Sequence, residues 1–299
     1  MTVPCSDGAL TRGDQLAATA SRVDRWLLVE QPGPWGPPAL PTARLPTDVA
    51  RHLVATARAA GARLLLIRRH RRSTGDGRRA YIVDSRPGHE QVLTTVASDL
   101  MGLLDLGLDG GGWTPVPDPL LLVCTHGRHD RCCAVRGRPV AEALLTAWPN
   151  DTWECSHVGG DRFAANLLVL PAGLYFGQLS PDEALDVVST LAAGRLPLDR
   201  LRGRSTGSTV VQAAEHFART ALDRDRLDDL ATGASEHLGA GRWRVVLAGS
   251  GGRPAVAVTL TAVQAPAARL TCGAIEDKVA LTYACEHVTV LPAVSWSAD

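Results

Sequence analysis

An apolar strand that runs directly into a group of cysteines is the feature that most constrains this chain. Residues 120–124 read LLLVC and are followed by THGRHDRCC, so Cys124 is soon joined by Cys132 and Cys133. Packing gives a buried strand no reason to end in thiols, whereas thiolates are ligands for zinc and for iron–sulfur clusters. If these thiols bind a metal, the fold must bring further ligands to the end of this strand.

The composition indicates a globular, cytoplasmic protein. Of the 299 residues 45% are apolar and 21% charged, and 31 basic residues balance 31 acidic ones. This zero net charge argues against nucleic acid as a partner. The N-terminus has no apolar core of a signal peptide and no run is long enough for a membrane span, so we expect no membrane partner. An odd seven cysteines do not predict a secreted disulfide framework.

Three segments follow from the predicted elements. The first contains strands at 25–30, 63–67 and 80–83 and a helix at 47–60, and the last contains a helix at 209–222 followed by strand-like runs. The first two segments share a strand–loop–helix–strand opening, which an internal duplication would produce, although the sequence alone does not favour one. The predicted domains are an N-terminal α/β domain at 1–118, a central domain at 119–204 and a C-terminal α+β extension at 205–299.

The central segment has the element order of a thioredoxin-like fold. The patterns predict a strand at 120–124, a helix at 139–148, a strand at 152–156, a hairpin of strands turning at Pro171, and a helix. That last helix begins with Ser180, Pro181, Asp182 and Glu183, which are favourable residues for an N-cap and a first turn. The order βαβ, ββ and α predicts an α/β class.

Four side chains are expected to converge at one edge of this predicted sheet. Cys124 ends the first strand, Cys133 lies further along the same loop, and His157 and Asp161 follow the second strand. The loops after two parallel strands joined by a helix lie at the same edge of a sheet. Two glycines between His157 and Asp161 let the second loop wrap closely around a ligand. Two thiolates, an imidazole and a carboxylate can together hold a metal centre.

The stretches WLLVEQPGPWG, CTHGRHDRCCAVRG and WECSHVGGDRFAANLLVLPAGLYFGQLSPDEA resemble the sucrase/ferredoxin-like family. Its ferredoxin module is similar to thioredoxin-like [2Fe–2S] ferredoxins, which carry a spaced cysteine pair in the first loop and C-x3-C in the second. In better understood members of the family the second pair is H-x3-H, so that two cysteines and two histidines bind the cluster. The resemblance is strong over 121–200.

The resemblance implies ligand positions for this chain. Cys124 and Cys133 take the two cysteine positions, His157 takes the first position of the second pair, and Asp161 stands where the family has its second histidine. Carboxylate is an unusual ligand for cluster iron. Asp161 is nevertheless the expected fourth ligand, because of its position in the pattern alone. The alternatives are a sulfur from Cys155 or Cys132, or a degraded site that holds zinc or nothing.

The resemblance implies electron transfer through a [2Fe–2S] cluster without bond chemistry. Histidine ligation raises the reduction potential above that of an all-thiolate cluster, and a carboxylate would lower it again. The redox partner, a reductase or an electron acceptor, is not identified by the sequence. Sugar hydrolysis needs two carboxylates across a sugar-sized cleft, and the sequence identifies no such pair.

Two other functions fit the same residues. A structural zinc site would use the same four side chains, with Zn in place of the cluster. A thiol-based redox enzyme is disfavoured because Arg128 and Arg131 stand at C-x3-R and C-x6-R from Cys124, where an anion-binding loop needs C-x5-R, and because C-x-x-C is absent. His126 and His129 are expected to shape the first loop or modulate the cluster. Cys5 is expected in a mobile tail, and Cys272 is expected to be a buried, inert thiol in a strand.

Overall fold

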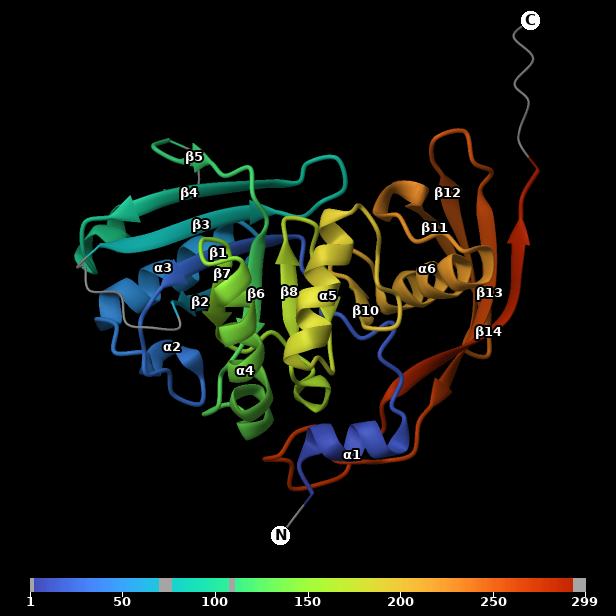
Figure 1. Cartoon of the computed structure of the whole chain (residues 1–299), viewed down its shortest axis with the longest axis horizontal. Coiled ribbons are helices and arrows are strands. Elements are labelled where there is room, and N and C mark those ends of the chain that lie inside the picture. Colours follow the sequence, from blue (N-terminus) through green and yellow to red (C-terminus); the bar gives the residue numbers. More distant parts are fainter. Residues whose placement is uncertain (1–2, 70–76, 108–110, 293–299) are drawn as a thin grey trace, which may run out of the picture.

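A computed structural model describes residues 3–69, 77–107 and 111–292, which form a large curled sheet with helices outside it and a smaller second sheet (Figure 1). The large sheet has ten strands in the order β10-β9-β8-β6-β7-β2-β1-β3-β4-β5, and the small one has four in the order β11-β12-β13-β14. The strands of the large sheet are β1 Arg25–Glu30, β2 Ala62–Arg68, β3 Arg78–Asp84, β4 Gln91–Ala97, β5 Thr114–Pro115, β6 Leu120–Cys124, β7 Thr152–Cys155, β8 Leu167–Leu170, β9 Leu174–Phe176 and β10 Leu201–Arg204.

The ten strands consist of two five-stranded units with the same topology. In the first unit β1 is parallel to β2 and antiparallel to β3, and β3, β4 and β5 follow one another antiparallel. In the second unit β6 is parallel to β7 and antiparallel to β8, and β8, β9 and β10 continue in the same way. The first four strands of each unit have the strand order of a thioredoxin-like fold. The predicted α/β class is therefore confirmed, and the shared opening of the two segments extends to their whole sheets.

The two units join edge to edge through β2 and β7. These strands pair antiparallel, with Ile67 opposite Cys155 and Arg68 opposite Glu154. Arg68 also forms an ion pair with Glu154 at 2.6 Å, which strengthens the same junction. The predicted domain boundary at residue 118 falls between β5 and β6 and stays a prediction, since one sheet runs through both units.

The large sheet curls around an aromatic core on its inner face. The Trp26 ring on β1 lies 6.3 Å from that of Tyr175 on β9, and Tyr81 on β3 lies 5.8 Å from Trp153 on β7. Strands this far apart in the sheet order could not touch if the sheet were flat, because neighbouring strands are about 4.8 Å apart. All four rings are buried. The two units therefore share a single inner core.

Helices cover the outer face of the curled sheet. Helix α3 packs on β1 and β2 in the first unit, and α4 and α5 pack on β6, β8 and β9 in the second (Figure 1). Helix α5 begins at Pro181 after the predicted cap Ser180, and the structure adds a complete capping box between Ser180 and Glu183. The helices are α1 Cys5–Arg12, α2 Ala39–Thr42, α3 Thr47–Ala59, α4 Arg131–Ala147, α5 Pro181–Ala192 and α6 Thr209–Leu222, with 3-10 turns η1 Met101–Asp105, η2 Asp161–Phe163 and η3 Leu227–Asp229.

Helix α4 begins earlier than the sequence predicts. The prediction placed the helix at 139–148. In the structure Asp130 caps the helix by accepting a hydrogen bond from the Cys132 backbone N–H at 2.8 Å, and Pro139 lies inside the helix. As a result Cys132 and Cys133 are helical residues of the first turn and not loop residues.

The C-terminal unit is an antiparallel sheet with α6 packed against it. Its strands are β11 Leu230–Gly239, β12 Arg242–Gly249, β13 Val256–Gln264 and β14 Leu281–Val290. The connection between β13 and β14 reaches back to α1 and runs beside it at the lower edge of the molecule (Figure 1). Within the described residues, no helix has the length and apolar content that a membrane span requires.

Candidate metal centre

Cys124 and Cys133 are placed by the junction between β6 and α4. Cys124 is the last residue of β6, and Cys133 lies in the first turn of α4, after the cap at Asp130. Helix and strand approach so closely that a β-carbon at Gly137 would lie 2.2 Å from the Cys124 carbonyl oxygen. Both thiols are fully buried.

His157 and Asp161 are placed by the loop after β7. Because β7 is parallel to β6, this loop lies at the same sheet edge as Cys124. Gly159 and Gly160 have φ angles of +101° and +80°, which favour glycine. The buried Arg202 of β10 fixes the loop by donating a hydrogen bond to the Gly159 carbonyl at 3.0 Å. No sequence pattern indicates this role for Arg202, because β10 is far from the loop in the chain.

The four predicted side chains meet at this edge. The donor atoms of Cys124, Cys133 and His157 lie within 4.8 Å of one another. Asp161 Oδ1 lies 3.3 Å from Cys133 Sγ and 3.0 Å from His157 Nδ1. Which of these groups bind a metal stays a prediction.

His129 is a further member of this site. Its ring stacks on that of His157 with 3.7 Å between the centroids, and its Nε2 lies 3.6 Å from Asp161 Oδ2. His129, His157 and Asp161 form a second group of donors within 4.8 Å of one another. The sequence predicts only a supporting role for His129, because local patterns do not determine the conformation of the loop that follows β6.

His126 is not a predicted ligand, but it contacts the His157 backbone. Its Nε2 lies 2.7 Å from the Gly36 carbonyl oxygen, and its Nδ1 accepts a hydrogen bond from the His157 backbone N–H at 3.3 Å. With both ring nitrogens engaged, His126 orients the His157 backbone. Trp35, in the Pro/Gly loop of the first unit, packs edge-on against the same ring at 5.8 Å. The first unit therefore provides one wall of a site whose donors come from the second.

The side chains of the site shift one another's pKa values. Hydrogen bonding from Cys133 and then from His157 holds the pKa of Cys124 well below its ordinary value, despite burial. The Cys124 thiolate, followed by burial and Asp161, raises the pKa of Cys133. Burial would lower the pKa of His157, but Asp161 and Cys124 outweigh it and raise this pKa to about 9. Metal binding would displace these protons.

The residues present fit a metal centre. His157 Nδ1 is buried and, although close to Asp161, lacks a partner with hydrogen-bond geometry. A buried imidazole nitrogen beside two thiols is suited to coordinate a metal ion. The same donor set can serve an iron–sulfur cluster or zinc, as the sequence predicts.

The two alternative sulfur ligands lie apart from this group. Cys155 is buried opposite Cys124 in the sheet, and the described residues do not place it among donors within 4.8 Å of one another. Cys132 points to a different group, 3.7 Å from Cys5 Sγ and 3.3 Å from Cys272 Sγ. The expectations for two other cysteines were wrong, since Cys5 is buried in α1 and Cys272 lies in a turn between β13 and β14.

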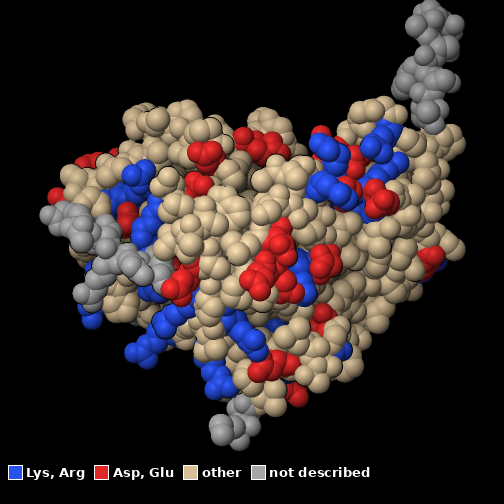
Figure 2. All heavy atoms as spheres, viewed as in Figure 1, with Lys and Arg blue, Asp and Glu red and all other residues tan. Residues whose placement is uncertain are grey.

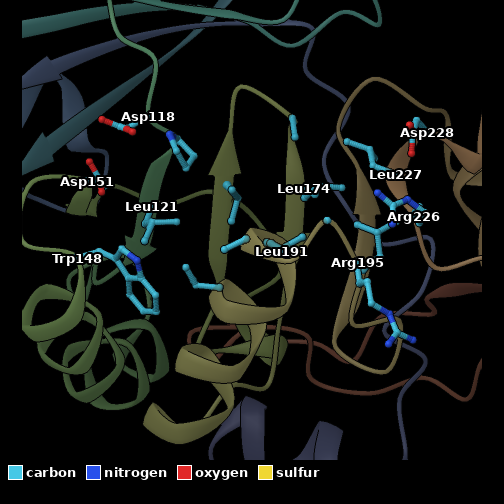
Figure 3. Close-up of a pocket in the computed structure, with 17 residues that line it drawn as sticks. Asp118, Leu121, Trp148, Asp151, Leu174, Leu191, Arg195, Arg226, Leu227 and Asp228 are labelled. Carbon is cyan, nitrogen blue, oxygen red and sulfur yellow. The ribbon is translucent and has the colours of Figure 1, made fainter.

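A large cavity lies at the other end of the second unit (Figure 3). It has a volume of about 660 Å³ and is lined mainly by apolar side chains such as Leu121, Trp148, Leu174 and Leu191. Leu121 stands near the start of β6, whereas Cys124 stands at its end. The cavity is therefore separate from the metal centre.

Comparison with known proteins agrees with this site. The family model described as sucrase/ferredoxin-like matches residues 16–203, which include all ten strands of the curled sheet except the last residue of β10. This chain belongs to the sucrase/ferredoxin-like family. The matched residues include Cys124, Cys133, His157 and Asp161 and exclude Cys5 and Cys272.

Two curated proteins are similar to this chain over a shorter stretch than the family model. Both are described as "Altered inheritance of mitochondria protein 32". The one from Candida glabrata is 28% identical over 101 residues, covering 29% of this chain and 32% of the relative. The one from Meyerozyma guilliermondii is 28% identical over 104 residues, covering 31% of this chain and 37% of the relative. The chain thus matches about a third of each relative's length.

Solved structures similar to this family member include two variants of the thioredoxin-like [2Fe–2S] ferredoxin from Aquifex aeolicus, Cys59Ser and Cys55Ser. Each is 18% identical and covers 28% of this chain and 97% of the ferredoxin, with a TM-score of 0.25. A TM-score this low carries no weight of its own. The thioredoxin-like fold of the second unit rests on its strand order.

Proposed function

We propose that this protein carries a [2Fe–2S] cluster at Cys124, Cys133, His157 and Asp161 and transfers single electrons. The observation that carries the proposal is that two buried thiols and the His157 imidazole meet at one sheet edge. Membership of the sucrase/ferredoxin-like family supports it.

The ligand set predicts the character of the centre. When bound, the cluster would supply a one-electron couple. His157 would replace an anionic thiolate with a neutral donor, which raises the reduction potential, and the Asp161 carboxylate would lower it again. His126 would hold His157 in orientation through its backbone N–H.

The stacked histidines form the outer wall of the centre, where electrons would enter and leave. The side chains of His129 and His157 are 35% and 23% exposed, whereas Cys124 and Cys133 are fully buried. Basic side chains lie around α4 (Figure 2), and a groove next to His126 is lined by Arg128, Arg131 and Arg138. These charges favour a redox partner with an acidic docking surface.

Metal analysis and visible spectroscopy on anaerobically purified full-length protein test the proposal. We expect broad visible absorption that bleaches with dithionite, together with about two irons and two acid-labile sulfides per chain. Cys124→Ser and Cys133→Ser should remove the colour, whereas Cys285→Ser, at an exposed thiol, should keep it.

Two outcomes would contradict the cluster. A colourless protein that loses a stoichiometric zinc ion in Cys124→Ser would favour a structural zinc site in its place. Protein that stays free of iron after anaerobic reconstitution would overturn the ligand assignment.

A further inference from the structure

A second group of metal-binding side chains lies beside the metal centre. It consists of Cys5 at the start of α1, Asp130 and Cys132 at the start of α4, and Cys272 between β13 and β14. Their donor atoms lie within 4.8 Å of one another, and none of them belongs to the first centre. Segments from both ends of the chain therefore meet at the helix that carries Cys133.

The spacing of the three sulfurs fits a single tetrahedral ion. Cys5 Sγ lies 3.7 Å from Cys132 Sγ and 3.6 Å from Cys272 Sγ, and the latter two lie 3.3 Å apart. Zinc–sulfur bonds of about 2.3 Å in a tetrahedron place the sulfurs about 3.8 Å apart. A disulfide joins only two sulfurs, at about 2.05 Å, and would leave the third unexplained.

Asp130 offers a fourth donor in a fixed position. Its Oδ1 accepts a hydrogen bond from the Cys132 backbone N–H at 2.8 Å, and its Oδ2 accepts one from the Cys272 N–H at 2.6 Å. Oδ2 also lies 3.6 Å from Cys5 Sγ. A carboxylate oxygen can accept more than one partner, so both oxygens remain able to contact a cation.

The charges at this group favour a cation. Cys5, Asp130 and Cys132 are buried, and within the described ranges Asp130 forms no ion pair with a basic side chain. A divalent ion would relieve this crowding of acidic groups.

The surroundings are also suited to metal-bound sulfur. Ser6 Oγ donates a hydrogen bond to Cys132 Sγ at 3.3 Å, and the Cys5 backbone N–H donates one to Cys272 Sγ at 3.5 Å. Helices α1 and α4 both begin at this group, and helix N-termini stabilise negative charge.

We propose that Cys5, Cys132, Cys272 and Asp130 bind a zinc ion. The ion would fasten α1 and the β13–β14 connection to the first turn of α4. Cys5 and Cys272 lie outside the residues 16–203 that match the family model, so the site is not part of that match. Since Cys132 precedes Cys133, the zinc site would hold the helix end that supports the first centre.

Zinc analysis of matched cysteine variants tests the proposal. We expect about one zinc per chain in the full-length wild type. Cys5→Ser and Cys272→Ser should lose this zinc, whereas Cys285→Ser, at an exposed thiol on β14, should keep it. Cys124→Ser should also keep it while losing iron, which separates this site from the first centre.

Binding of added metal provides a second measurement that needs no variant. After chelation, the wild type should take up one Co²⁺ with the intense visible bands of tetrahedral cobalt thiolate, and Zn²⁺ should displace it. Bound Zn²⁺ should protect three additional thiols from alkylation.

Three results would overturn the zinc site. One is zinc that leaves in Cys124→Ser but stays in Cys272→Ser, which would place the ion at the first centre. Another is a peptide map that shows a disulfide between two of the three cysteines in protein purified under reducing conditions. The last is a chelated wild type that binds neither Zn²⁺ nor Co²⁺.

Discussion

At the scale of single residues, Asp161 is where the candidate metal centre departs from the H-x3-H pattern that the family resemblance implies. Its carboxylate lies within 3.6 Å of Cys133, His157 and His129, so it contacts both halves of the predicted ligand set. Burial opposes its ionisation, but the His157 imidazole, 3.0 Å away, keeps the pKa of Asp161 below its ordinary value. A charged carboxylate is thus available at the position where the family resemblance implies histidine.

Substitution of Asp161 tests its role as the fourth ligand. Asp161→His restores the H-x3-H pattern and should keep the cluster with a higher reduction potential, because it removes a negative charge beside the iron. Asp161→Ala should weaken iron retention by about tenfold or more. Iron content and redox titration of both variants give the answer. Full iron content and an unchanged potential in Asp161→Ala would show that another group is the fourth ligand.

Asp84 gives a pH-dependent contribution to stability. It accepts hydrogen bonds from the side chains of Arg86 at 2.6 Å and Arg25 at 3.2 Å. Burial raises the pKa of Asp84, but these donors prevail and lower it. Its stabilisation is therefore present above the unfolded-state pKa of about 3.9 and is lost as the pH falls through the lower folded-state pKa.

We therefore expect Asp84→Asn to cost about 1–2 kcal/mol in the free energy of unfolding at pH 7. The difference from the wild type should shrink below about pH 4, where the unfolded-state carboxyl is protonated. Urea unfolding across this pH range measures it, with Asp118→Asn at an exposed position as control. A difference that grows toward low pH would contradict this account.

At the scale of elements, the contact between β6 and α4 positions both thiols of the centre. Gly137 allows it, because a side chain there would meet the Cys124 carbonyl oxygen. Gly8 is also a glycine inside a helix, but the nearest atom to a β-carbon there would be the side-chain end of Arg12 at 3.0 Å, not backbone. The two positions therefore form a matched pair.

Alanine should have opposite effects at these two glycines. Gly137→Ala should destabilise the protein by about 1–3 kcal/mol or more, since helix and strand must separate. It should also weaken metal retention by moving Cys133 away from Cys124. Gly8→Ala should be neutral or stabilising by up to about 1 kcal/mol, because alanine favours the helix. Thermal unfolding and metal content of both variants measure this. Equal stabilisation by alanine at both positions would mean that helix propensity alone decides, and would contradict this account.

At the scale of the whole molecule, the two five-stranded units share one sheet and one inner core. They share the junction between β2 and β7, and the inner core takes Trp26 and Tyr81 from one unit and Trp153 and Tyr175 from the other. Neither unit can bury its aromatic face alone. Removal of one unit would expose large apolar side chains of the other.

The separated central segment should therefore fail to fold. Residues 119–204 expressed alone should give a collapsed, poorly dispersed NMR spectrum, whereas the full chain should give a dispersed one with a single unfolding transition in its sheet. A well-dispersed spectrum of the isolated segment would establish it as an independent domain and would contradict the shared core.

The sequence by itself determined the local parts of this structure. The apolar pattern predicted β1 and α6 with their observed bounds, and Ser180 with Glu183 predicted the start of α5, because these signals depend only on neighbouring residues. The order of elements and the rule for parallel strands also predicted that Cys124, Cys133, His157 and Asp161 would meet.

Only the tertiary structure decided which distant segments touch. It placed His129 against His157, Arg202 beneath the glycine loop, and Cys5 and Cys272 against Cys132. It also joined the two units through β2 and β7 around one aromatic core. Such contacts depend on sheet curvature and on packing between residues far apart in the chain. Composition and local periodicity do not contain that information, because they report how a segment folds and not what it meets.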